Sequence, residues 1–209
     1  MLKITNLQLK LGRIERFVVT LEDGQELVFT PESVAQFGMA PNKEFSEQEF
    51  LEILQIDQVR QAKDQALRLL AIRPHSRTEL IRKMRERGYR TSVIEQALDE
   101  LEKLDLVNDE EFAKIFIQNE LQLRPVGRML LRQKLLERGI PAEIFEPLLQ
   151  SLYPAEQEAE IARRLSEKFL RTHSKEKKRK SREKLVRFLL GKGFSWEQIR
   201  EVMGLAPEE

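Results

Sequence analysis

The feature that most constrains this chain is a basic helical segment that ends at a glycine and occurs three times. The three copies are residues 79–89, 130–140 and 184–194. In each copy, apolar residues recur three or four positions apart among lysines and arginines, a spacing that predicts an amphipathic helix. A glycine followed by an apolar residue closes each copy and predicts a Schellman-type helix end; the pairs are Gly88–Tyr89, Gly139–Ile140 and Gly193–Phe194.

The glycines recur about every 50 residues, which leaves room for three helices of ordinary length in each repeat. We therefore predict three-helix modules at residues 46–104, 108–153 and 154–203, each with a leading helix, a glycine-terminated helix and a shorter closing helix. Because such a unit buries little surface alone, we expect stacked modules in an elongated, curved body. Apolar residues at matching positions are predicted to form the core: Leu80, Leu131, Leu185, Met84, Leu135, Leu189, Ile94, Phe145 and Ile199.

Residues 1–41 have a different pattern, which predicts a small β-rich extension ahead of the helices. Apolar and polar side chains alternate over residues 3–30, as is typical of two or three half-buried antiparallel strands. Asp23–Gly24 predicts a tight hairpin, because these residues readily adopt the positive φ that the turn requires. Pro31 then predicts the start of a short helix that ends at Gly38.

Helix starts are marked by a polar residue followed three positions later by Glu or Gln. In this arrangement the first side chain accepts a hydrogen bond from the first turn, and the second side chain bonds back to the cap residue. Ser46 with Glu49 predicts the start of a long helix that ends before Pro74. Four further starts are predicted in the same way: Ser76 with Glu79, Ser92 with Glu95, Asn108 with Glu111, and Ser195 with Gln198.

The composition offers few groups for catalysis. The chain has no Cys and only two His, so no thiol nucleophile, disulfide or Cys/His metal site is expected. No Gly-rich phosphate-binding pattern is present, and capping and solvation explain the acidic residues near the helix starts. An enzyme that uses these acids is the least supported class, and we predict no catalytic residue, no cofactor and no metal.

The sequence also indicates where the protein acts. The N-terminus shows no signal-peptide pattern, and no apolar run is long enough to span a bilayer. The absence of Cys fits a reducing compartment. We therefore expect a cytoplasmic protein that is not bound to a membrane and that is a monomer.

The net charge is only +1, but the charges are unevenly distributed along the chain. Residues 163–192 carry a large excess of Lys and Arg, and the remainder is acidic. Cations beside the apolar stripe of each repeated helix could contact a polyanion or an acidic protein, or could only keep a helical surface solvated. The candidate partner-binding residues are Arg73, Arg82, Arg85, Arg87, Arg124, Arg128, Arg132, Lys134, Arg138, Lys177, Lys178, Arg179, Lys180, Arg182 and Arg187.

Several short motifs resemble, in order and spacing, those of the RecX family, regulators of the RecA recombinase. They are Arg73-Pro74-His75-Ser76, Glu79-Leu80, residues 106–113, Arg124-Pro125-Val126-Gly127 and residues 135–140. The resemblance implies a tandem array of three-helix modules that binds in the groove of the RecA–single-stranded DNA filament. It implies that such binding limits filament growth, strand exchange and ATP hydrolysis without catalysis, in homologous recombination, DNA repair and the SOS response.

Two interpretations remain open at this point. The resemblance implies RecA and single-stranded DNA as partners, with double-stranded DNA as a further candidate. The alternative is a helical-repeat module that binds DNA without RecA, which predicts a strongly salt-dependent affinity for DNA alone. The very basic residues 175–182 leave open whether protein or DNA dominates the contact in the third module.

Overall fold

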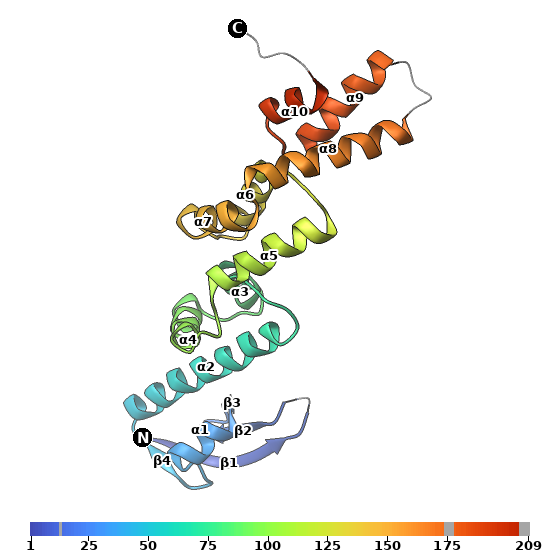
Figure 1. The fold of residues 1–209 in the computed structure, drawn as a ribbon. Helices are drawn as coiled ribbons and strands as arrows, with labels where there is room; N and C mark the ends of the chain where they lie inside the picture. The colour runs from blue at the N-terminus through green and yellow to red at the C-terminus, as the bar shows by residue number, and fades with distance from the viewer. Residues whose placement is uncertain (13, 174–177, 205–209) are drawn as a thin grey trace. The chain divides into compact units, whose positions relative to one another are not determined.

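A computed structural model describes the chain except for residues 13, 174–177 and 205–209. Within the described part, the chain forms a small antiparallel sheet and ten helices. The first helix lies between two strands of the sheet, and the other helices follow the sheet, as can be traced in Figure 1. This mainly helical architecture, with three successive three-helix domains after the sheet, confirms the predicted fold class. The chain divides into two compact units, which are residues 1–74 with 80–107 and residues 75–79 with 108–209.

The N-terminal sheet has four described strands in the order β3-β2-β1-β4. They are β1 (Leu2–Lys10), β2 (Arg16–Leu21), β3 (Glu26–Phe29) and β4 (Glu44–Phe45). The predicted hairpin joins β2 to β3, and Gly24 adopts a positive φ of 84°. The alternating pattern predicted the first three strands and missed β4, which is too short to show an alternation and pairs with β1 from a distant part of the segment.

Helix α2 (Glu47–Leu70) joins the sheet to the first helical repeat because it contributes to two cores. Phe50, near its start, packs into the core of the sheet, whereas Ala62 packs against the helices that follow. Between the two cores, the fully buried Asp57 accepts hydrogen bonds from the Thr30 amide at 2.8 Å and from the Thr30 hydroxyl at 2.6 Å. The sheet and the first repeat therefore belong to the same compact unit.

The short helix α1 (Pro31–Phe37) lies ahead of the three repeats and ends at Gly38, as predicted. Each repeat then consists of a leading, a basic and a closing helix. The leading helices are α2, α5 (Asp109–Leu123) and α8 (Ala155–Thr172). The basic helices are α3 (Arg77–Arg85), α6 (Arg128–Leu136) and α9 (Lys178–Gly191). The closing helices are α4 (Thr91–Lys103), α7 (Ala142–Leu152) and α10 (Trp196–Met203). All nine predicted core residues are at most 3% exposed, and each leading helix adds a fully buried alanine: Ala62, Ala113 and Ala162.

The three basic helices end in the predicted glycine turns. Gly88, Gly139 and Gly193 have φ values of 86°, 75° and 79°. In each turn, the apolar residue after the glycine donates its amide to the carbonyl five residues earlier, at 3.1 to 3.2 Å. This bond is the mark of the Schellman arrangement, in which the left-handed residue is almost free of strain only if it is glycine.

Most predicted helix starts are confirmed, and one is wrong. Side-chain hydrogen bonds to the first turn are present at Ser46, Ser76, Asn108 and Ser195. The start predicted at Ser92 is wrong, because α4 begins at Thr91 and its N-cap is Arg90, which makes no side-chain cap bond. Arg90 lies two residues after Gly88, and the other two closing helices have their N-caps at the same distance from their glycines. The glycine turn therefore sets the start of α4.

Two equivalent junctions join successive repeats within the second unit. At each junction, the segment that starts a basic helix packs against the glycine turn of the following repeat. The Ser76 hydroxyl donates to the Arg138 carbonyl at 2.6 Å, and the Gly127 amide donates to the Lys192 carbonyl at 2.8 Å. Both acceptors are the residue directly before the glycine of the turn, so the two junctions use the same acceptor position.

A second contact also occurs at both junctions. The backbone amide of Arg77 donates to Asp109 Oδ1 at 2.8 Å, and that of Arg128 donates to Glu158 Oε1 at 2.7 Å. Each donor is the first residue of a basic helix, and each acceptor is a carboxylate on the leading helix of the next repeat. A carboxylate at this position satisfies an amide that has no partner within its own helix and favours the positive end of the helix dipole.

The junctions are so close that they require glycine. A Cβ added at Gly139 would overlap the Thr78 side chain, and one added at Gly127 would overlap the backbone of Gly193. Residues 75–79 group with the second unit because these contacts bind them to the second repeat.

Candidate partner-binding surface

The first basic helix, α3, exposes its predicted contact residues. Arg82, Arg85 and Arg87 are exposed, and none of their guanidinium groups forms a hydrogen bond or ion pair with another described residue. Arg73, ahead of the helix, is also exposed and donates to the Pro74 carbonyl at 2.7 Å. The α3 arginines therefore retain their full hydrogen-bonding capacity for a partner.

The second basic helix, α6, has the same kind of sequence, but its cations have intramolecular partners. The Arg132 guanidinium binds the Glu146 carboxylate through two hydrogen bonds of 2.6 and 2.9 Å. Lys134 forms an ion pair with Glu120. These acids lie on the closing and leading helices of the same repeat, α7 and α5, so the ion pairs contribute to its packing.

The cations at the two ends of α6 are also paired. Arg128 Nε donates to the Tyr153 carbonyl at 2.8 Å and lies 3.5 Å from Glu158. Arg138, just beyond the helix, lies 4.2 Å from the centre of the Phe116 ring and 3.9 Å from Glu79. Both are half-buried and connect elements of the second unit.

These contacts shift the ionisation of the groups around α6. The hydrogen bond from Arg132 lowers the pKa of Glu146 below its ordinary value of 4.5 and raises that of Arg132 itself. Burial raises the pKa of Tyr153, whose hydroxyl donates to the Val126 carbonyl at 2.8 Å. The Arg132–Glu146 pair and Tyr153 are thus fixed in their ordinary charge states near neutral pH.

The third basic helix, α9, resembles α3 in its exposure. Arg179, Lys180, Arg182 and Arg187 are exposed, and Arg179 lies 3.2 Å from Glu183, one turn along the same helix. Arg124, between α5 and α6, is exposed as well. Two further predicted contact residues are not fully described by the structure. Lys177 lies outside the described residues, and Lys178 is described only in its backbone.

No local pattern in the sequence indicates the acids that pair with the α6 cations. Glu120 and Glu146 each lie 14 residues from their cation, and Glu158 lies 30 residues from Arg128. Such separations match neither a helical turn nor a strand pair. Only the packing of the repeat brings these carboxylates to the helix.

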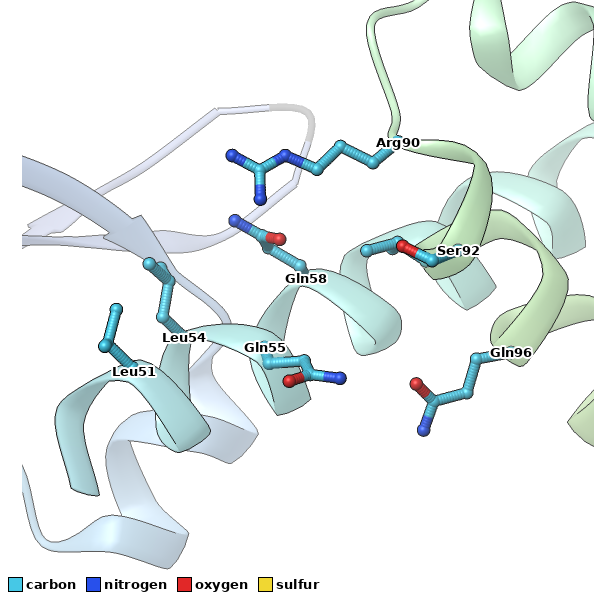
Figure 2. A pocket seen from close by; sticks show the side chains of 8 residues that line it. Leu51, Leu54, Gln55, Gln58, Arg90, Ser92 and Gln96 are labelled. Atoms are coloured by element: carbon cyan, nitrogen blue, oxygen red, sulfur yellow. The ribbon is translucent and has the colours of Figure 1, made fainter. Parts of the chain in front are cut away.

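Two clefts occupy equivalent positions in the first and third repeats. The first has a volume of about 380 Å³ and is lined by residues of α2 and the start of α4: Leu51, Leu54, Gln55, Gln58, Arg90, Ser92, Val93 and Gln96. Figure 2 shows the α2 side chains on one side and Arg90, Ser92 and Gln96 on the other. The second has a volume of about 330 Å³ and is lined by Arg128, Met129, Arg132, Ala155, Glu158, Ser195, Glu197, Gln198 and Glu201.

Within the described residues, the structure shows no group of three or more His, Asp or Glu side chains that could hold a metal ion. None of the described helices combines the length and apolarity needed to cross a bilayer. The features that remain are repeated helices and exposed cations. They define a helical-repeat protein, a class in which stacked units present extended surfaces to macromolecular partners.

Comparison with known families agrees with the predicted resemblance. Family models for the first, second and third three-helix domains of RecX match residues 62–101, 108–147 and 156–203. The chain belongs to the RecX family.

Individual relatives extend the comparison to most of the chain. A regulatory protein RecX of Caldanaerobacter subterraneus subsp. tengcongensis is 30% identical over 182 residues, covering 86% of this chain and 89% of that protein. A regulatory protein RecX of Chlorobaculum tepidum is 38% identical over 146 residues, which cover 69% of this chain and 87% of that protein. A crystal structure of regulatory protein RecX shares the fold with a TM-score of 0.74 at 22% identity, covering 98% of this chain and all of that one. RecX from Lactobacillus salivarius aligns with a TM-score of 0.64 at 26% identity, covering 71% and 96%.

Proposed function

We propose that this chain is a non-enzymatic regulator that binds in the groove of the RecA–single-stranded DNA filament. Binding there limits filament growth, strand exchange and ATP hydrolysis. Membership of the RecX family supports RecA as the partner, since the relatives are named regulatory proteins. The observation that carries the proposal is that the side chains of Arg82, Arg85 and Arg87 are exposed and pair with no described acid.

The contact residues fall into two groups. The exposed cations are proposed to contact the filament directly: Arg73, Arg82, Arg85, Arg87, Arg124, Arg179, Lys180, Arg182 and Arg187. Lys177 and Lys178 are proposed to extend the α9 group. The α6 cations Arg128, Arg132, Lys134 and Arg138 already have intramolecular partners, so a filament contact there requires an ion pair to be exchanged. We therefore propose that they contribute less.

The proposal also covers the setting in which the chain acts. A regulator of RecA would work as a monomer in the cytoplasm, during homologous recombination and DNA repair. The filament offers both protein surfaces and DNA phosphates, and the dense cations of α9 suit phosphates, whose contacts weaken as salt concentration rises. The α3 arginines, which can form planar two-bond contacts with carboxylates, suit a protein surface.

The test is RecA ATPase activity on single-stranded DNA at increasing concentrations of the chain. Turnover should fall to a low plateau, and a triple substitution of Arg82, Arg85 and Arg87 by Ala should shift the curve to higher concentration. Arg163→Ala is the matched control, because Arg163 is an exposed arginine outside the proposed surface and pairs with Glu201 at 3.2 Å. Turnover that is unchanged at saturating concentration would show that the proposal is wrong.

The exposed cations of α9 also favour a second candidate, a DNA-binding module that acts without RecA. This candidate predicts tight, strongly salt-dependent binding to DNA alone. Titration of labelled single- and double-stranded DNA at two salt concentrations, with and without RecA, distinguishes the two functions. Affinity that depends on RecA supports the regulator, and equal affinity in its absence supports the DNA-binding module.

A further inference from the structure

The two junctions define an inter-repeat docking site. Its parts are a glycine turn, a residue on the leading helix four positions before the buried alanine, and the start of the closing helix. In the third repeat these parts are Gly193, Glu158 and residues 195–201, and the start of α6 occupies the site. In the second repeat the turn is at Gly139 and the leading-helix residue is Asp109, and the start of α3 occupies the site.

The first repeat has the same docking site, and this site is open, in that no described residue covers its glycine turn. The equivalent parts are Gly88, Gln58 and residues 90–96, and the last two line the cleft of about 380 Å³ in Figure 2. The positions correspond in detail, since the cleft residues Arg90, Ser92, Val93 and Gln96 match Ser195, Glu197, Gln198 and Glu201 of the occupied site. A Cβ added at Gly88 would meet no atom within 4 Å, whereas Gly139 and Gly193 are covered by the preceding basic helix.

We propose that the open docking site of the first repeat binds the N-terminal end of an α-helix of the RecA protomer, one with a small N-cap residue and acidic side chains in its first turn. The inference rests on the proposed function and deepens it, because it assigns a protein contact within the same filament. The two occupied sites show which kind of element fits, namely a helix start whose cap is Ser76 or Gly127.

The small cap residue follows from the geometry of the turn. The residue directly before each glycine presents its carbonyl to the cap of the incoming helix, where it accepts a hydrogen bond from the Ser76 hydroxyl in one site and from the Gly127 amide in the other. In the open site this carbonyl belongs to Arg87. At the third-repeat site, a Cβ added to the cap residue Gly127 would already overlap the backbone of the turn at Gly193, and the cap at the second-repeat site is the small Ser76.

The acidic first turn follows from charge. At the second-repeat site, Glu79 of the incoming helix lies 3.9 Å from Arg138, the residue before the glycine, and Arg87 holds that position in the open site. Arg90, which lines the cleft at the start of α4, is exposed as well. A carboxylate in the incoming first turn would gain a cationic partner here and would also complement its own helix dipole.

The same charges argue against other occupants. Gln58 replaces the carboxylates of Asp109 and Glu158, so the open site lacks the acid that receives an arginine-bearing helix start. The α9 start of a second copy is strongly basic and would be repelled. Leu51, Leu54 and Val93 give the cleft apolar walls, which suit a helix better than a phosphate.

The test uses the full-length chain, labelled with a fluorophore and titrated against RecA filaments on single-stranded DNA. Gly88→Asn fills the open turn, and Asn is the side chain that best tolerates the left-handed conformation. Arg87→Glu reverses the charge that receives the acid. Gly204→Asn is the control, because Gly204 also has a positive φ, of 62°, and no atom near its missing Cβ. Thermal melting checks that all three variants fold.

Both docking-site variants should raise the Kd for the filament about tenfold, with the control within about twofold of wild type. If wild type binds the filament and Gly88→Asn binds it with the same Kd, the inference is overturned and the proposed function stays intact. If wild type fails to bind filaments at all, the proposed function fails. If the docking-site variants lose as much affinity for bare DNA as for the filament, the site binds phosphate. If wild type self-associates and Gly88→Asn abolishes this, the site binds a second copy of the chain. Either result overturns the inference.

Discussion

The helices α3 and α6 have the same basic pattern and the same glycine ending, yet their cations have different surroundings. The α6 cations bind carboxylates of the surrounding helices, and the turn after α6 is covered by the start of α3. The side chains of Arg82, Arg85 and Arg87 have no described partner, and no described atom covers the turn at Gly88. A repeated sequence element can therefore stabilise packing in one repeat and remain available for binding in another.

The largest difference should appear when both glycine turns receive the same methyl group. Gly88→Ala and Gly139→Ala share the strain of a left-handed alanine, about 1–2 kcal/mol. Gly139→Ala must also displace Thr78, which should add about 1–3 kcal/mol to the loss of unfolding free energy. Urea denaturation of both variants measures the difference, and equal losses would show that the junction at Gly139 is looser than the structure indicates.

The next effect concerns binding. Replacing Arg82, Arg85 and Arg87 by Ala should weaken filament binding about tenfold and leave the unfolding free energy within about 0.5 kcal/mol of wild type. These side chains have no described partner to lose. Anisotropy titration and denaturation on the same samples separate the two quantities. A large loss of stability would mean that α3 depends on its arginines as α6 does.

A smaller effect on stability is expected in α6. Arg132→Ala removes the two hydrogen bonds to Glu146 and should lower the unfolding free energy by about 1 kcal/mol, since both side chains are partly exposed and solvent screens the pair. A double-mutant cycle with Glu146→Gln isolates the coupling. A coupling energy near zero would remove the distinction between the two helices at this position.

The smallest effect is a pH dependence. Arg132 lowers the pKa of Glu146, so the pair contributes stability that is fully present above the ordinary pKa of 4.5 and is lost as the pH falls through the lowered value. Glu146→Gln should therefore flatten the decline of stability with acid, measured by denaturation between about pH 5 and pH 3. The capping carboxylate of Glu49 remains in both proteins as a common background. An unchanged acid profile in the variant would contradict the assignment.

Much of the fold could be predicted from local pattern. The glycine turns, the matched core positions, the N-terminal hairpin and four of the five capped helix starts depend on residues within a few positions of one another. The exceptions have different causes. Strand β4 is defined by pairing with the distant β1, which no local pattern shows. The start of α4 follows from the nearby turn at Gly88 and not from the cap pattern at Ser92.

The candidate surface could be predicted only in composition. The recurrence of three basic, glycine-terminated helices can be read from local pattern, because helix periodicity and the positive φ of glycine are local properties. Which cations are paired, and which glycine turn is covered, depends on the packing of the repeats. Glu146 reaches Arg132 across the repeat, and Thr78 covers Gly139 from the preceding one. Gly88 ends the first basic helix, so no preceding basic helix is available to cover its turn, and no atom of the described residues lies over it.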